Sequence, residues 1–138
     1  MNIEVLSLCD AATVDVDGKL NVLGAFDTFW TGNVPALYPA CAIAIRIRFD
    51  NSERGVHTIS INFVDLDGNF IIPAINGKIN VSFPDEQRSG SANLVFNIQR
   101  LRLENHGEYS IDLSVDGTME STAPLFVRER KSEINPPA

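Results

Sequence analysis

The stretch HTISINFVDLDGNF, residues 57–70, combines the two signals that decide the fold of this chain. Its first half alternates apolar and polar residues, so that Ile59, Ile61 and Phe63 share one face of an extended strand. Its second half carries an Asp-Gly pair, which is typical of a tight turn between two strands. The stretch therefore predicts a half-buried strand that ends in a β-hairpin.

The same alternation recurs along the chain. Four further segments show it: AIAIRIRF (42–49), GKINVSF (77–83), SANLVFNI (91–98) and GEYSIDLSV (107–115). After Ile98 the apolar phase slips by one, to Leu101 and Leu103, which predicts a bulge or bend around Gln99 and Arg100. No stretch holds an apolar period of 3.6 residues, so we expect no substantial helix.

These strands predict an all-β protein, a single antiparallel β-sandwich that is immunoglobulin-like or jelly-roll-like, with about eight to nine strands. A chain of 138 residues with 44% hydrophobic content suits one domain. We expect residues 1–130 to form one β-sandwich domain and residues 131–138 to form a flexible C-terminal tail.

Three Asp-Gly pairs are expected to close hairpins through three-residue loops, at residues 16–18, 66–68 and 115–117. A two-residue turn at the first pair would mix apolar and polar side chains on each face of the hairpin, whereas a three-residue loop separates them. The opposed pairs that follow are Val14 with Leu20, Phe63 with Ile71, and Leu113 with Met119. The glycines expected at positive φ are Gly18, Gly68 and Gly117.

The Asp-x-Asp-Gly pattern at residues 15–18 and 65–68 has an alternative interpretation, because calcium loops of the EF-hand type also begin this way. Such a loop needs a bidentate glutamate near its end, and neither segment has one. Lys19 would also repel the ion. We therefore favour the hairpins and predict no metal site and no cofactor.

Composition limits the partners. The net charge of -7 argues against a nucleic-acid backbone, which attracts clustered Lys and Arg, so we expect no nucleic acid. No apolar run approaches 18 residues and the N-terminus has no secretory signal, so we expect no membrane association and a cytoplasmic location. Cys9 and Cys41 are then expected as buried thiols, and their spacing leaves open whether they lie close together.

Candidate catalytic residues are few. His57 is expected at the rim of the core and His106 in a turn. Neither lies in a local signature of a hydrolytic triad, and the chain has no GxSxG or GxGxxG motif. We therefore expect no enzyme activity and no catalytic residue.

The segment FDTFWTGNVPALYPA, residues 26–40, is unusually aromatic for a connection between strands. It either caps one end of the sandwich with Trp30 and Tyr38 tucked in, or exposes an aromatic binding surface. The candidate binding residues are Phe29, Trp30, Asn33, Leu37 and Tyr38. The predicted function is a non-enzymatic interaction or structural module that associates with itself or with a protein partner through a strand edge. The alternative is a small-ligand binder, for example of carbohydrate, that uses this segment.

The chain also resembles a family of small bacterial proteins that form a domain of unknown function. The resemblance covers about residues 5–127 and rests on DGKLNVLGAFD, on Gly-x-His before a strand, on SANLV, and on GEY before the last hairpin. It implies a bacterial, cytoplasmic β-sandwich with no assigned reaction, and it transfers no catalytic residue to this chain. The GEYSIDLSVDG segment is also similar to immunoglobulin-like sandwiches in general.

Overall fold

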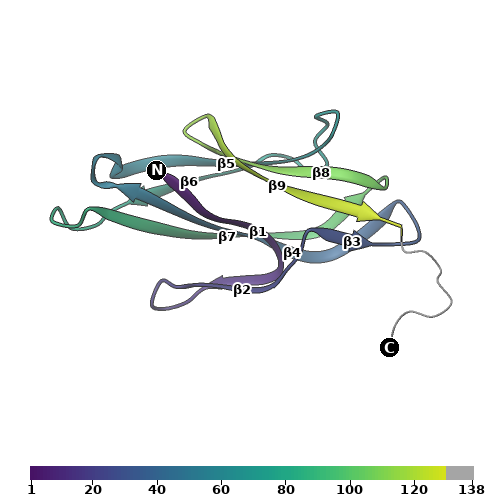
Figure 1. The fold of residues 1–138 in the computed structure, drawn as a ribbon, viewed down its shortest axis with the longest axis horizontal. Coiled ribbons are helices and arrows are strands. Elements are labelled where there is room, and N and C mark those ends of the chain that lie inside the picture. Colours follow the sequence, from purple (N-terminus) through teal and green to yellow (C-terminus); the bar gives the residue numbers. More distant parts are fainter. Residues whose placement is uncertain (130–138) are drawn as a thin grey trace.

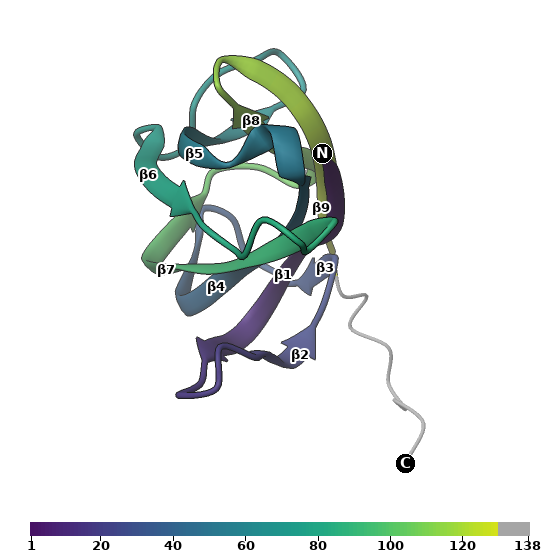
Figure 2. The same ribbon diagram turned by 90° about the vertical axis from the view of Figure 1, so that its left-hand side faces the viewer.

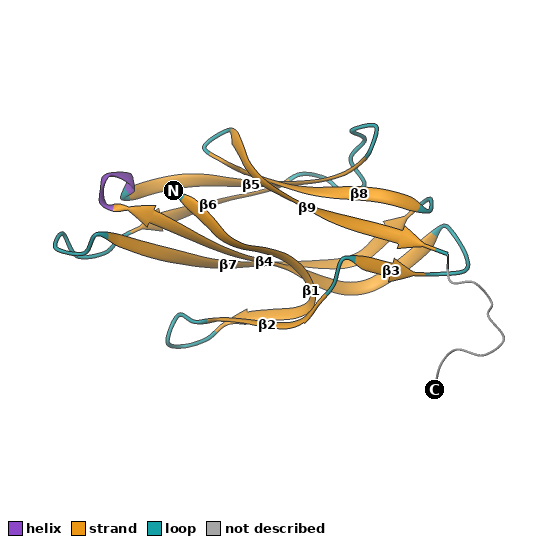
Figure 3. Ribbon diagram, in the orientation of Figure 1, coloured by secondary structure: helices purple, strands orange, loops and turns teal. Residues whose placement is uncertain are grey.

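A computed structural model describes residues 1–129 of the chain, which form nine strands and one turn of 3-10 helix (Figures 1 and 3). The strands are β1 (Asn2–Val14), β2 (Leu20–Ala25), β3 (Thr28–Trp30), β4 (Ala36–Asp50), β5 (Gly55–Asp65), β6 (Ile75–Val81), β7 (Ser89–Leu103), β8 (Gly107–Val115) and β9 (Thr118–Arg128). The 3-10 turn, η1 (Asn51–Glu53), connects β4 to β5. The tail predicted at residues 131–138 lies outside the described residues. Residues 1–129 contain no helix long and apolar enough to cross a membrane.

The strands form two sheets, which confirms the predicted all-β sandwich. One sheet has the order β2-β1-β4-β7 and the other has the order β3-β9-β8-β5-β6. Figure 1 shows the β5 and β8 layer lying over the β4 and β7 layer. Every pairing is antiparallel except that of β3 with β9, which is parallel over three residues. The sequence did not predict this short parallel strand, because it lies inside the aromatic segment.

The inward faces of the two sheets meet in one main core, as the alternation of β4 and β5 predicts. Ile45 and Phe49 on β4, and Ile59 and Phe63 on β5, have no exposed surface. Each buried side chain of this size contributes roughly 1.5–3 kcal/mol through the hydrophobic effect. The core therefore fixes the register of both central strands, since a slip by one residue would expose it.

Two of the three predicted hairpin loops are confirmed. Asp15 N donates to Lys19 O at 3.0 Å and Asp65 N donates to Asn69 O at 2.9 Å, so each loop has three residues. The paired residues of the first hairpin include Val14 with Leu20, and Ile71 N donates to Phe63 O in the second. The three glycines have φ values of +79°, +84° and +84° at positions 18, 68 and 117.

The third loop was predicted wrongly. Val115 pairs with Thr118, which leaves a two-residue turn of Asp116 and Gly117. The bulge lies within the paired strands, where the register shifts between Leu113 and Ser114, and not in the loop. Asp116 itself has a φ of +52°. Its backbone and carboxylate explain this left-handed conformation, because Asp116 N donates to Thr58 O and Asp116 Oδ1 accepts from Thr58 N at 2.9 Å.

The phase slip predicted near Arg100 is present in β7. Arg100 has a φ of +57°, and the pairing of β4 with β7 omits Pro39 and Arg100 without a change of register. The strand bends there instead of gaining a residue. The bend keeps both Ile98 and Leu101 buried, although three positions along a regular strand would put them on opposite faces.

The hairpin of residues 10–25, here called the flap, turns away from the sandwich. The first half of β1 pairs with β4 and its second half pairs with β2. Figures 1 and 2 show β2 on the side of this sheet away from β5 and β8. The flap packs Ala12 and Leu20 against a second, small cluster of buried residues, Cys9, Ala42 and Ala44. Asn93 on β7 anchors the flap's turn, because its Nδ2 donates to Gly18 O at 2.7 Å.

Both cysteines are buried and free, as predicted, but they face different clusters. Cys41 belongs to the main core and Cys9 to the cluster under the flap. Cys9 pairs with Ala42 across β1 and β4, so the two thiols lie on opposite faces of one sheet. Burial raises the pKa of the Cys9 thiol, and burial together with the Cys9 charge raises the pKa of Cys41 to about 11.

Candidate functional site: an aromatic hollow

The aromatic segment packs its rings where the flap meets the two sheets. Tyr38 on β4 stacks on Phe26 with ring centroids 5.4 Å apart, and it forms a T-shaped pair with Phe29 on β3 with centroids 4.9 Å apart. All three rings are half-buried and pack on the main core. Large aromatic rings in this arrangement stabilise the junction beyond the area that they bury.

These rings border a hollow of about 410 Å³, here called the aromatic hollow. Its lining is Asp10, Gly24, Ala25, Phe26, Thr28, Phe29, Trp30 and Tyr38. Trp30 is 51% exposed, whereas Phe29 and Tyr38 beside it are half-buried. The hollow therefore offers an indole ring at its border and a carboxylate at the flap.

Asp10 and Tyr38 form the polar part of the aromatic hollow. The Tyr38 hydroxyl donates to Asp10 Oδ1 at 2.9 Å. Burial, and then the hydrogen bond to Asp10, raises the pKa of Tyr38 to about 12, so its hydroxyl stays a donor at neutral pH. Gly24 lies against the same carboxylate, since a Cβ built on it would be 2.5 Å from Asp10 Oδ2.

The structure gathers three of the five predicted binding residues. Phe29, Trp30 and Tyr38 line the aromatic hollow, while Asn33 and Leu37 do not. Asn33 lies in the turn after β3, where its backbone N donates to the Thr31 hydroxyl at 3.3 Å. Leu37 is 56% exposed and follows the alternation of β4 to the face opposite Tyr38.

Sequence reasoning missed the flap residues of the aromatic hollow. Asp10 was not selected, although its charge interrupts the otherwise uncharged run LSLCDAATV of β1. A carboxylate in the middle of a long strand is a usable signal, because such a position usually carries an uncharged residue. Gly24 has a φ of +69°, and nothing in its sequence context separated it from an ordinary strand glycine.

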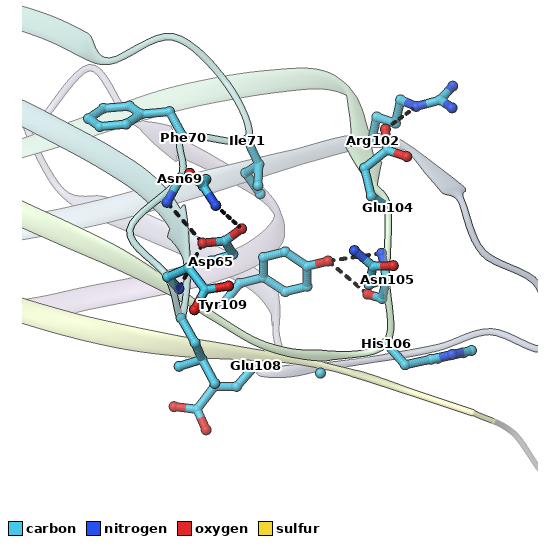
Figure 4. A pocket seen from close by; sticks show the side chains of 13 residues that line it. Asp65, Asn69, Phe70, Ile71, Arg102, Glu104, Asn105, His106, Glu108 and Tyr109 are labelled. Atoms are coloured by element: carbon cyan, nitrogen blue, oxygen red, sulfur yellow. Dashed lines mark hydrogen bonds and ion pairs between the residues drawn. The ribbon is translucent and has the colours of Figure 1, made fainter.

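A second hollow, of about 460 Å³, lies between residues 65–71 and residues 102–109 (Figure 4). Its polar groups bond mainly to their own loops. Asp65 Oδ1 accepts from the backbone N of Asp67 and of Asn69, each at 2.9 Å. The Tyr109 hydroxyl donates to Asn105 O at 2.7 Å, four residues back in the chain, as in the tyrosine corner of β-sandwiches.

The carboxylates of this second hollow do not assemble a metal site in the part of the chain that the structure covers. No three His, Cys, Asp or Glu side chains gather closely enough there to hold an ion. The backbone and side-chain donors of Asn69 lower the pKa of Asp65, together with other groups of its own turn. The hydrogen bonds of Asp65 within its own hairpin therefore explain why a carboxylate lies at this position.

His57 lies at the rim of the core, as predicted, and forms the one histidine–carboxylate pair among residues 1–129. Nδ1 lies 2.7 Å from Asp116 Oδ2, and Nε2 contacts Glu53 O. Its ring also stacks on Phe49, with centroids 4.8 Å apart. Because an acceptor oxygen lies at each ring nitrogen, the imidazole can form both hydrogen bonds only when it is protonated and both nitrogens carry a hydrogen.

This contact predicts a pH-dependent stability. The Asp116 hydrogen bond, and then the Glu53 carbonyl, raise the pKa of His57 above its usual 6.5. Because the pKa of His57 is higher in the folded protein, its contribution to stability is complete at a pH below the pKa of the unfolded chain. The contribution is lost as the pH rises through the pKa of the folded protein. We expect the free energy of unfolding, measured in urea from about pH 6 to about pH 9, to fall over that window.

The control variants are His57→Phe, which keeps the ring on Phe49, and His106→Gln. The first should remove most of this pH dependence and the second should keep it, because His106 Nε2 contacts the backbone carbonyl of Thr31. An unchanged slope in His57→Phe would show that another group is responsible.

Comparison with known proteins adds a distant structural similarity. No curated protein matches the sequence. Among solved structures, the chain is similar to part of the alkylpurine DNA glycosylase AlkC of Pseudomonas fluorescens, solved bound to DNA containing an abasic site analog. The match has a TM-score of 0.50 and 10% identity, and it covers 92% of this chain and 30% of the glycosylase chain. At this identity the similarity shows the fold alone.

This similarity corrects one prediction. Nucleic acid was excluded as a partner because of the net charge of -7, and that exclusion is wrong, since a domain of this fold lies in a protein solved bound to DNA. Net charge describes the whole surface, whereas contact with a nucleic acid depends on local groups. The charge of the whole chain is therefore no ground for excluding such a partner.

The family comparison agrees with the resemblance read from the sequence. A family described as a family of unknown function (DUF6941) matches residues 4–128, nearly the same span as the 5–127 expected from the sequence segments. The match begins within β1 and extends to the end of β9, so it includes both sheets and the flap. The chain therefore belongs to the family of unknown function DUF6941.

Proposed function

We propose that the protein is a non-enzymatic binding module and that the aromatic hollow is its binding site. The observation that carries the proposal is the exposure of Trp30, 51%, beside rings that pack on the core. A large aromatic residue gains most from burial, so an indole held open at a hollow is typical of a contact surface. The aromatic hollow is wide open to solvent, which leaves its lining accessible to a ligand.

The chemistry of the lining favours a saccharide as the ligand. A sugar ring has an apolar C–H face, which can stack on an indole, and hydroxyl groups, which can donate to a carboxylate. Trp30 supplies the indole and Asp10 supplies the carboxylate. Tyr38 holds that carboxylate in place through its hydroxyl, so the acceptor is oriented before the ligand arrives.

The non-enzymatic part of the proposal is supported by the surroundings of the two histidines. Both nitrogens of His57 are engaged by Asp116 and by a backbone carbonyl, which leaves neither free to take a proton from a nucleophile. His106 Nε2 lies 3.1 Å from Thr31 O. The two free thiols on opposite faces of one sheet suit a reducing compartment, so we include a bacterial cytoplasm in the proposal.

The test is a titration followed by the fluorescence of Trp30, the single tryptophan of the chain. We expect one or more neutral oligosaccharides from a panel to shift the emission, and Trp30→Ala, followed by calorimetry, to weaken binding by about tenfold or more. Tyr38→Phe should weaken it less, because the ring remains and only the hydrogen bond to Asp10 is lost.

Phe70→Ala is the matched control, because Phe70 is 54% exposed and lies in the second hollow. It should bind as the unmodified protein does. If no saccharide shifts the emission, or if single-stranded oligonucleotides shift it and saccharides do not, the saccharide assignment is wrong. If Trp30→Ala and Phe70→Ala lose saccharide affinity equally, the binding site is not the aromatic hollow.

A further inference from the structure

The outer edge of β7 is a long strand edge that no other described strand covers. β7 runs over 15 residues and pairs with β4 on one side, and no other described strand pairs with its second side. A free edge presents unpaired N–H and C=O groups, which can template pairing with another chain. Natural proteins shorten, bend or charge such edges.

The other three sheet edges carry such devices. β2 has six residues and a glycine at φ +69°, and β3 has three residues. β6 carries Lys78 at its centre. β7, in contrast, has no charged residue and no proline from Ser89 to Gln99, and it bends only beyond that, at Arg100.

The sequence of β7 is complementary to itself when the strand runs antiparallel. A two-fold axis through Leu94 sets Ala92 opposite Phe96 of a second copy and Gly90 opposite Ile98. Each pair joins a small residue to a large one. Residues that face the core in one copy lie opposite residues that face the core in the other copy. Ala92, Leu94 and Phe96 are only partly buried in the single chain, so pairing would cover them further.

We propose that two copies of the chain pair β7 to β7 in this register, which joins their four-stranded sheets into one sheet of eight strands. The occupant of the edge is a second copy because the complementarity lies within one sequence. Charge supports it as well. Each chain carries a net charge of -7, and the uncharged strip from Ser89 to Gln99 lets two such chains meet without like charges opposite each other. This inference is independent of the saccharide site.

Light scattering during size exclusion tests the proposal on the full chain. We expect a mass of twice the 15.2 kDa chain at micromolar concentration. The variant Ser91→Lys with Asn97→Lys should be a monomer, because the register sets residue 91 opposite residue 97 and so places lysines opposite each other twice. Both side chains are exposed in the single chain, so the fold should tolerate the change.

The matched control is Asn76→Lys with Asn80→Lys, which adds the same two charges to exposed positions on the β6 edge. It should stay a dimer. A monomeric unmodified protein, dissociation of both variants, or a dimer in both would each overturn the proposal. If the β7 variant does not fold, amide exchange in the unmodified protein decides. Protection of residues 89–99 must then increase with protein concentration, and protection that is independent of concentration would also overturn it.

Discussion

Replacing Phe63 with alanine is expected to lower the free energy of unfolding by about 3–5 kcal/mol, measured by urea denaturation. Phe63 has no exposed surface and lies on β5 opposite Ile111 of β8, where it faces the main core. Removing the ring forfeits its transfer free energy and leaves a cavity that the surrounding close-packed core cannot fully close.

Phe70→Ala provides the comparison for this prediction, since it removes the same ring from the same hairpin. Phe70 is 54% exposed and its strand pairing is a single bridge to Val64. We expect its replacement to cost about 1 kcal/mol or less. Similar losses in the two variants would mean that Phe63 is not part of the central core.

Much of this fold could be predicted because the alternation of apolar and polar residues along a strand shows which of its faces is buried. The inward positions of β4, β5 and β8 were read from the sequence, since one face of each strand is uniformly apolar. The first two hairpins were predicted for the same reason, because only one loop length separates apolar from polar faces. The third failed because a tertiary contact, from Asp116 to Thr58, selects the turn there.

The flap could not be predicted from alternation, but β4 carries a sign of it. Outward-facing residues of this strand change from Ala42 and Ala44 to Arg46 and Arg48. The alanines lie under the flap, whereas the arginines bond to Glu4 at 2.7 Å on the open part of the same face. Small residues on a supposedly solvated face indicate that another segment approaches closely, which a pattern with a single period does not show.

The aromatic hollow was only partly predictable because its residues come from four separate strands, β1 to β4. Composition identified the aromatic segment, and its rings do meet. The carboxylate comes from β1, 28 positions before Tyr38, and no local pattern links the two. Asn33 and Leu37 were included by proximity in sequence, although neighbouring positions on a strand point to opposite faces.

Gly24 is the position that joins the flap to the aromatic hollow, and Gly24→Ala is expected to lower the free energy of unfolding by about 2–5 kcal/mol. Two effects add. A φ of +69° strains any residue with a Cβ, and the new methyl group would lie 2.5 Å from Asp10 Oδ2. Asp10 must then rotate away, which breaks its hydrogen bond with the Tyr38 hydroxyl.

Gly18→Ala separates these two effects, because Gly18 has a φ of +79° but open space where its Cβ would lie. It should show the strain alone, about 1–2 kcal/mol. Combining Gly24→Ala with Asp10→Ala should bring the cost of the Gly24 change down to that of Gly18→Ala, since the carboxylate is then absent. If Gly24→Ala costs the same with and without Asp10, the close approach of Gly24 and Asp10 does not hold the base of the flap, and the orientation of the carboxylate in the aromatic hollow must have another cause.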